Sequence, residues 1–196
     1  MIFEIIKILA LQVENYTDLN VELGNIANVD SQNGNGLNNR TVVTLVNYNE
    51  EGTLRNVPNR RIEGDRSYLQ QPSVSLNLFL LFSNTRNNYE EALKDISKVL
   101  EYFQSHRVFT QSNTDYNRAQ YPNLDNFQFH MDLHSISFED LNYIWGSLGG
   151  KQYPSVLYKL RVVNIAEDHV IDQAGILGQT SFNAQNSTQN GGNQPL

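Results

Sequence analysis

The sequence predicts an α+β fold: a single small domain in which about three helices pack on a mixed or antiparallel sheet, plus a flexible C-terminal arm. Capped helical patterns and strand-like runs follow one another without the regular alternation of a parallel α/β protein. The length of 196 residues suits one domain with a substantial core. After Ile165 the apolar period fades, and the polar segment that follows buries too little apolar surface to order by itself. We therefore assign residues 1–166 to the domain and residues 167–196 to the arm.

The clearest pair of elements is a helix and a strand within residues 137–163. Ser137 is a suitable N-cap, and the two acidic residues in the first turn suit the positive end of the helix dipole. Gly149-Gly150 ends the helix, and the alternation of apolar and basic residues from residue 155 onward indicates a strand. Because Trp145 lies on the apolar face of the helix, we expect it in the core. The apolar residues of this helix, at helical spacing, are Leu141, Ile144, Trp145 and Leu148.

The other regular elements follow from the same two periodicities. A helix from residue 89 has the most regular pattern, and Asn88 with Glu91 forms a capping box at its start. Its expected apolar face is Tyr89, Leu93, Ile96, Leu100 and Phe103. A further helix is expected over 1–15. Strands are expected over 21–26, 41–48, 72–82, 107–110 and 127–133. The inward side of the last strand is expected to be Phe127, Phe129, Met131 and Leu133. Residues 28–40 and 111–125 have the composition of loops.

The composition excludes several classes of function. A net charge of −7 and a pI near 5.0 disfavour sequence-independent binding to nucleic acid. The sequence has no cysteine, which removes disulfides, thiolate nucleophiles and cysteine metal ligands together. No apolar run approaches the roughly 20 residues needed to cross a bilayer, so we expect no direct membrane insertion.

His130, Asp132 and His134 form the one cluster with the character of metal ligands. Strand alternation places all three on one face, as a metal ion would require. The same alternation also makes them the polar side of a half-buried strand, and we favour that interpretation because no further ligand is evident. A metal-dependent hydrolase is the alternative. The sequence contains no nucleophile elbow, phosphate loop or defined carboxylate pair, so we expect no enzyme, no catalytic residue, no bound metal and no cofactor.

The charged segment 50–71 is the candidate for contact with a partner. It has no apolar period and no expected regular structure, and long loops inside a compact domain are usually functional or disordered. Arginines in such a segment most often form a solvated face, but in a chain this acidic their concentration also indicates a charge-matched protein contact as the alternative. The predicted contact residues are Arg55, Asn56, Arg60, Arg61 and Arg66 in this segment and Ile176, Leu177 and Phe182 in the arm.

A stretch in the C-terminal half also carries a resemblance to a known family. It reads W-G-S-L-G-G-K from Trp145 and P-S-V-L-Y-K-L-R from Pro154. In this stretch the chain resembles the tail-terminator, or cap, proteins of phage-tail-like contractile injection systems of the antifeeding-prophage type. Collinear segments extend the resemblance over residues 1 to about 166; they are M-I-F-E-I-I, L-G-N-I-A, T-L-R-N, S-L-N-L-F-L-L-F and the run that begins Y-E-E-A-L-K.

The resemblance implies a structural protein without catalytic residues. Such caps are small α+β domains that assemble as a homohexameric ring on the distal end of the inner tube. The ring ends tube growth and joins the last sheath ring, so the implied partners are a second copy, the inner-tube protein and the sheath protein. Assembly would take place in the bacterial cytoplasm, as part of the particle. A soluble adaptor that anchors or loads the particle is the remaining alternative.

Overall fold

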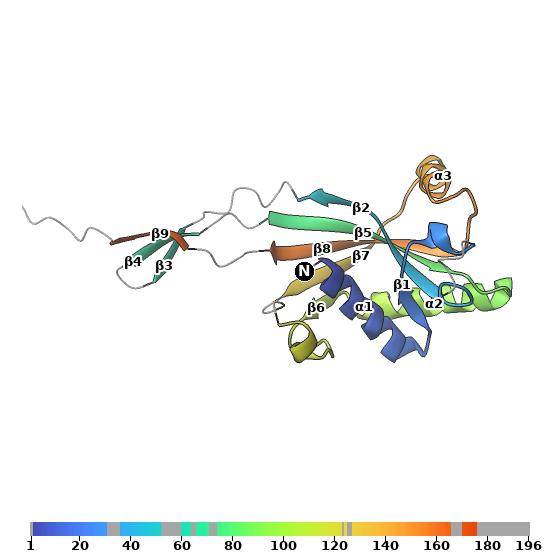
Figure 1. Ribbon diagram of the computed structural model, residues 1–196, viewed down its shortest axis with the longest axis horizontal. Helices are drawn as coiled ribbons and strands as arrows, with labels where there is room; N and C mark the ends of the chain where they lie inside the picture. The colour runs from blue at the N-terminus through green and yellow to red at the C-terminus, as the bar shows by residue number, and fades with distance from the viewer. Residues whose placement is uncertain are drawn as a thin grey trace, which may run out of the picture. The chain divides into compact units, whose positions relative to one another are not determined.

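The structure is a computed structural model that describes residues 2–30, 36–51, 60–63, 66–70, 74–122, 124, 127–165 and 170–175 (Figure 1). The chain divides into two compact units. The first comprises Met1–Val57 with Pro72–Glu167, and the second comprises Pro58–Gln71 with Asp168–Leu196. Among the described residues, no helix is both long and apolar enough to span a membrane.

A six-stranded sheet forms the centre of the first unit, within the part of the chain that the structure describes. Its order is β1-β2-β5-β8-β7-β6. The first pair is parallel and the others are antiparallel, which makes the sheet mixed and confirms the predicted α+β class. The strands are β1 Val21–Leu23, β2 Thr41–Glu50, β5 Val74–Asn84, β6 Val108–Thr110, β7 Gln128–Leu133 and β8 Ser155–Ile165.

Helices cover both faces of this sheet. Figure 1 shows α1 (Ile2–Thr17) and α2 (Tyr89–Ser105) on one face and α3 (Phe138–Ser147) on the other. Short 3₁₀ turns, η1 (Ile26–Asn28) and η4 (Arg118–Gln120), lie in the connections. The expected helices and strands of this unit are therefore present, and the short strand β6 lies at a sheet edge.

Each sheet face has its own apolar core, because successive side chains of a strand point to opposite faces. On β5, Leu78, Leu80 and Phe82 join the larger core under α1 and α2. Leu81 instead joins a second core under α3, which also contains Trp145. The central strands are buried on both sides, and they place α2 and α3 on opposite faces of the sheet.

Two predicted apolar faces need correction. On α2 the exposed fractions of Tyr89 and Leu93 are 66% and 44%, although both were expected to be buried. The buried face of α2 is instead made by Ala92, Asp95, Ile96, Val99, Tyr102 and Phe103. The helix is therefore rotated relative to the expected face, with the buried carboxylate of Asp95 held by hydrogen bonds. Leu133, at the end of β7, is 56% exposed rather than inward-facing.

The second unit contains a three-stranded antiparallel sheet of order β3-β4-β9. Its strands are β3 Arg60–Glu63, β4 Arg66–Gln70 and β9 Val170–Gly175. The prediction that 50–71 lacks regular structure is thus wrong for β3 and β4. β3 pairs with β4 as a hairpin, and β4 also pairs with β9, a segment about a hundred residues away, which no local apolar period signals. The division of the chain at residue 166 stays a prediction.

Candidate contact surfaces

The predicted arginine contacts fall on one hairpin of the second unit. Arg60 and Arg61 lie on β3, opposite Leu69 and Tyr68 of β4, and Arg66 lies on β4 opposite Glu63. The hairpin therefore brings three arginine positions close together along the main chain. The other predicted contacts, namely Arg55, Asn56, Ile176, Leu177 and Phe182, lie outside the described residues.

The three candidate metal ligands, His130 and Asp132 on β7 and His134 directly after it, are engaged in other contacts. Arg161 donates to Asp132 Oδ2 from Nε at 2.8 Å and from Nη2 at 2.7 Å. The ring of His134 packs edge-on against Phe79, with 5.0 Å between ring centroids, and His130 Nε2 lies 3.1 Å from Gln128 Nε2. Within the described ranges, no group of three His, Asp or Glu side chains is placed to hold a metal ion. These side chains form the polar face of a strand.

The family-like segment from Trp145 builds the end of α3 and the turn into β8. Ser137 Oγ accepts the Asp140 N–H at 3.1 Å, which confirms the N-cap. Gly149 and Gly150 have φ angles of 100° and 78°, in the left-handed region that glycine adopts without strain. The Gly150 N–H closes the helix by donating to Trp145 O at 2.7 Å. The segment thus supplies local structure at the junction of α3 and β8.

The first turn of α3 leaves a large apolar side chain in solvent. Phe138 is 91% exposed, more than any other large apolar side chain in the described part of the chain. Its neighbours Glu139 and Asp140 are also exposed. Glu139 accepts from Tyr143 Oη at 3.2 Å and Asp140 from Ser137 Oγ at 2.7 Å, and neither forms an ion pair with any described residue. This turn is therefore both apolar and acidic.

On the opposite face of the sheet, a hollow of about 320 Å³ lies between the C-terminal half of α2 and the end of β7. We call it the α2–β7 hollow. Burial raises the pKa of Tyr158 in its wall to about 12, and the positive charge of nearby Arg107 acts in the opposite direction. Arg107 is exposed and has no ion pair among the described residues. The apolar lining comes from Leu100, Phe103, Met131, Leu133 and Tyr158, and the polar lining from Gln104, Arg107 and Asp132.

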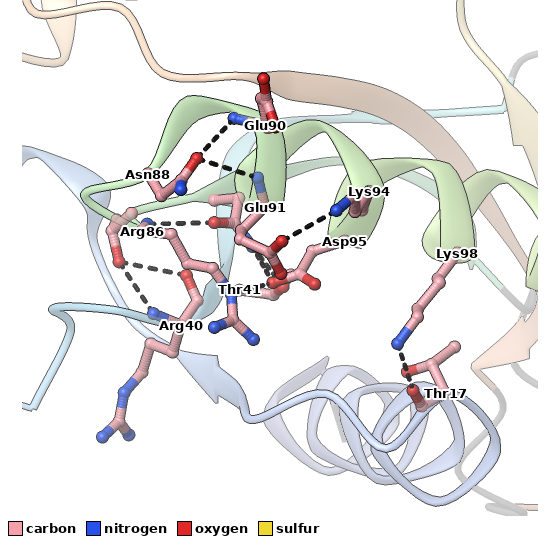
Figure 2. A network of polar contacts seen from close by, with 12 residues as sticks. Thr17, Arg40, Thr41, Arg86, Asn88, Glu90, Glu91, Lys94, Asp95 and Lys98 are labelled. Atoms are coloured by element: carbon pink, nitrogen blue, oxygen red, sulfur yellow. Dashed lines mark hydrogen bonds and ion pairs between the residues drawn. The ribbon is translucent and has the colours of Figure 1, made fainter.

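A buried polar network fixes the start of α2 to the sheet (Figure 2). Asp95 Oδ2 accepts from Asn84 Nδ2 at 2.9 Å and also from Arg86 Nε. The same Asn84 nitrogen lies 3.1 Å from Thr41 Oγ1, at the start of β2. Asn88 Oδ1 caps the helix by accepting the Glu90 and Glu91 N–H groups, as the capping box predicts. The network therefore joins α2, β5 and β2.

Comparisons with known proteins identify one family and two solved structures with a similar fold. The sequence profile of the Pvc16 N-terminal domain matches residues 4–177. The fold is similar to that of the PVC sheath/tube terminator of an extracellular contractile injection system in its extended state, with a TM-score of 0.60 and 16% identity over 97% of this chain. It is also similar to the tube-terminating cap of the anti-feeding prophage, with a TM-score of 0.55 and 16% identity over 91% of this chain. The chain spans 65% and 61% of the lengths of those two proteins. No curated protein matches it.

Proposed function

The chain belongs to the Pvc16 N-terminal domain family, and on that basis we propose that it is the structural cap, or tail terminator, of a contractile injection system. The family match over residues 4–177 is the observation that carries the proposal. The solved structures with the same fold support it, because their names describe a sheath/tube terminator and a tube-terminating cap. The resemblance found in the sequence is confirmed at the level of the family.

The proposed cap is a homohexameric ring on the distal end of the inner tube, which ends tube growth and joins the last sheath ring. A growing tube presents the same surface at each new ring. A terminator must bind that surface on one side and offer no copy of it on the other. A closed ring of head-to-tail contacts meets this requirement, because its rotation closes and needs no further stacking surface. The ring would assemble in the bacterial cytoplasm as part of the particle.

This role requires no catalysis. The rival metal-dependent hydrolase would need Asp132 as a ligand, but the Arg161 guanidinium holds that carboxylate through two short hydrogen bonds. An approaching cation would have to displace Arg161 and also bring in the two histidine rings. The contacts on β7 therefore support a structural protein over the hydrolase.

The arginine-bearing segment is the proposed side that contacts tube or sheath. Arginine forms fork-shaped, charge-assisted hydrogen bonds with carboxylates, and the β3–β4 hairpin gathers Arg60, Arg61 and Arg66. Arg55 and Asn56 precede the hairpin in the sequence. Ile176, Leu177 and Phe182 follow β9 and are proposed as apolar contacts of the same side.

Reversing three of these charges tests the assignment. The variant Arg55→Glu, Arg60→Glu and Arg61→Glu should leave the fold intact, because the first unit contains both apolar cores. We expect particles with uncapped tubes, uncontrolled length or missing sheath in electron micrographs. The control is Lys94→Glu, Lys98→Glu and Arg118→Glu, the same change of charge at exposed positions of the first unit. Capped particles of normal length from the test variant would exclude the segment as the contact.

The proposed division of the chain has its own test. Removing residues 167–196 deletes β9, which pairs with β4 of the second unit, but leaves the six-stranded sheet complete. We expect the shortened chain to keep its far-UV and near-UV circular dichroism and a cooperative thermal transition. Loss of near-UV signal would place residues of the arm within the fold of the domain.

A further inference from the structure

Phe138 is exposed in a way that the isolated subunit does not explain. Fully burying a phenylalanine side chain is worth about 1.5–3 kcal/mol, and this one is 91% exposed at the first position of α3. Trp145, in the same helix, already anchors α3 to the sheet. Phe138 is therefore not needed to dock its own helix, and it projects as an apolar knob.

The α2–β7 hollow has the complementary character. Its apolar wall includes the 56%-exposed Leu133 and the half-buried Leu100, which offer apolar surface that the chain itself does not cover, whereas Met131 in the same wall is buried. Its volume of about 320 Å³ is at the small end of the range for ligand sites, about 300–1,000 Å³. It suits an inserted side chain better than an extended ligand.

Charges match at the edges of these two features. Two acidic residues, Glu139 and Asp140, directly follow the knob, and neither is ion-paired within the described ranges. Arg107 lines the hollow and is also without an ion pair there. Asp132, the acidic residue of the lining, forms an ion pair with Arg161, which reduces its repulsion of an acidic partner segment. An aromatic side chain flanked by carboxylates therefore fits this hollow in both shape and charge.

We propose that the Phe138 knob of one copy of this chain seats in the α2–β7 hollow of a second copy. The knob belongs to α3 and the hollow to α2 and β7, and Figure 1 shows α3 and α2 on opposite faces of the sheet. The contact joins two different surfaces, so it is head-to-tail and repeats from copy to copy. The inference rests on the proposed function, because the cap is what requires these head-to-tail contacts to close into a ring.

The absence of native cysteine allows a direct test by cross-linking. Asn142→Cys, one turn after Phe138 on α3, and Gln104→Cys, in the lining of the hollow, are changes at exposed positions, so each variant should fold and keep both the knob and the apolar wall. The two variants, carrying different tags, are co-produced with the rest of the particle and treated with a short bis-maleimide. We expect a product that contains one copy of each variant. A chain with both changes should give a ladder of multimers. The control replaces Gln104→Cys by Ser97→Cys, an exposed position on α2 outside the hollow, and should give no product.

Three results would overturn the proposal. They are a product between two Asn142→Cys copies alone, an equal yield with Ser97→Cys, and no mixed product in particles that carry the chain at their ends. The last result would leave the cap function standing, because micrographs of the same particles report it separately. If the product forms but the chain is missing from particle ends, the self-contact stands and the cap function fails.

A charge exchange provides a second measurement, on the purified full-length chain. Phe138→Ala should weaken self-association about 30-fold or more, as expected for a central aromatic anchor. Arg107→Glu should also weaken it, and Glu139→Arg in the same chain should restore part of the loss, because each contact then regains an opposite pair. Sedimentation over a range of concentrations gives the affinity. Equal affinity for Phe138→Ala and the native chain, or no self-association of the native chain, would contradict the contact.

Discussion

Replacing Trp145 by alanine should lower the free energy of unfolding by roughly 3–5 kcal/mol, the range for deleting a buried aromatic side chain. The predicted core position is confirmed, since Trp145 is 4% exposed. It is the fully buried residue of α3, so the alanine variant removes the main anchor of that helix. Urea denaturation followed by circular dichroism measures the loss. The side chains around it in the second core include Ile26, Val29, Val42, Leu81 and Leu157.

Trp145→Phe is the matched control. The indole Nε1–H of Trp145 is buried, and no acceptor among the described residues reaches it. Phenylalanine keeps most of the ring contacts and removes this unsatisfied donor, whose burial costs about 1–3 kcal/mol. The loss for Trp145→Phe should therefore be clearly smaller than that for Trp145→Ala. An unchanged denaturation midpoint for the alanine variant would show that Trp145 is a surface contact. A loosened α3 should also weaken the proposed contact through Phe138.

The helix α3 and the strand β8 could be predicted from the sequence because their signals are local. The N-cap at Ser137, the left-handed glycines and the strand alternation all lie within residues 137–163. Each signal acts on the main chain within a few residues, so distant parts of the chain have little influence on it. The family resemblance was found in the same stretch.

The buried face of α2 could not be predicted in the same way. Counting apolar residues at helical spacing included Tyr89 and Leu93, which are exposed, and left out Asp95, which is buried. A carboxylate is buried only where hydrogen-bond partners compensate its lost hydration. Those partners, Asn84 and Arg86, precede the helix, and their side chains meet Asp95 only in the folded protein.

Contact surfaces that are built from distant segments of the chain have no local signal in the sequence. β4 pairs with β9, so the strands of segment 60–70 depend on residues 170–175. The α2–β7 hollow is built from residues 100–107, 131–133 and 158, and no motif connects them. The exposure of Phe138 was equally hidden, because a phenylalanine in the first turn of an amphipathic helix is consistent with either face.

The network around Asp95 provides a test of how α2 is held. Asp95 is 4% exposed, and Figure 2 shows it enclosed between the start of α2 and the start of β2. Removing one partner of a buried ion pair leaves the other uncompensated, at a cost of about 3–5 kcal/mol. The Arg86 side chain is 35% exposed and regains water in part, so the cost here should be lower.

We expect Asp95→Ala to lower the free energy of unfolding by about 2–4 kcal/mol, because Asn84 and Arg86 lose their shared acceptor and a small void replaces the carboxylate. The matched control on the same helix is Glu91→Ala. Glu91 accepts from Lys94 Nζ at 2.9 Å in an exposed pair, and its removal should leave the denaturation midpoint unchanged. Denaturant titration of both variants, with the slope compared to that of the native chain, separates lost stability from a changed unfolded state. Equal midpoints for Asp95→Ala and Glu91→Ala would mean that the apolar core alone holds α2, and that the network contributes nothing to the position of the hollow.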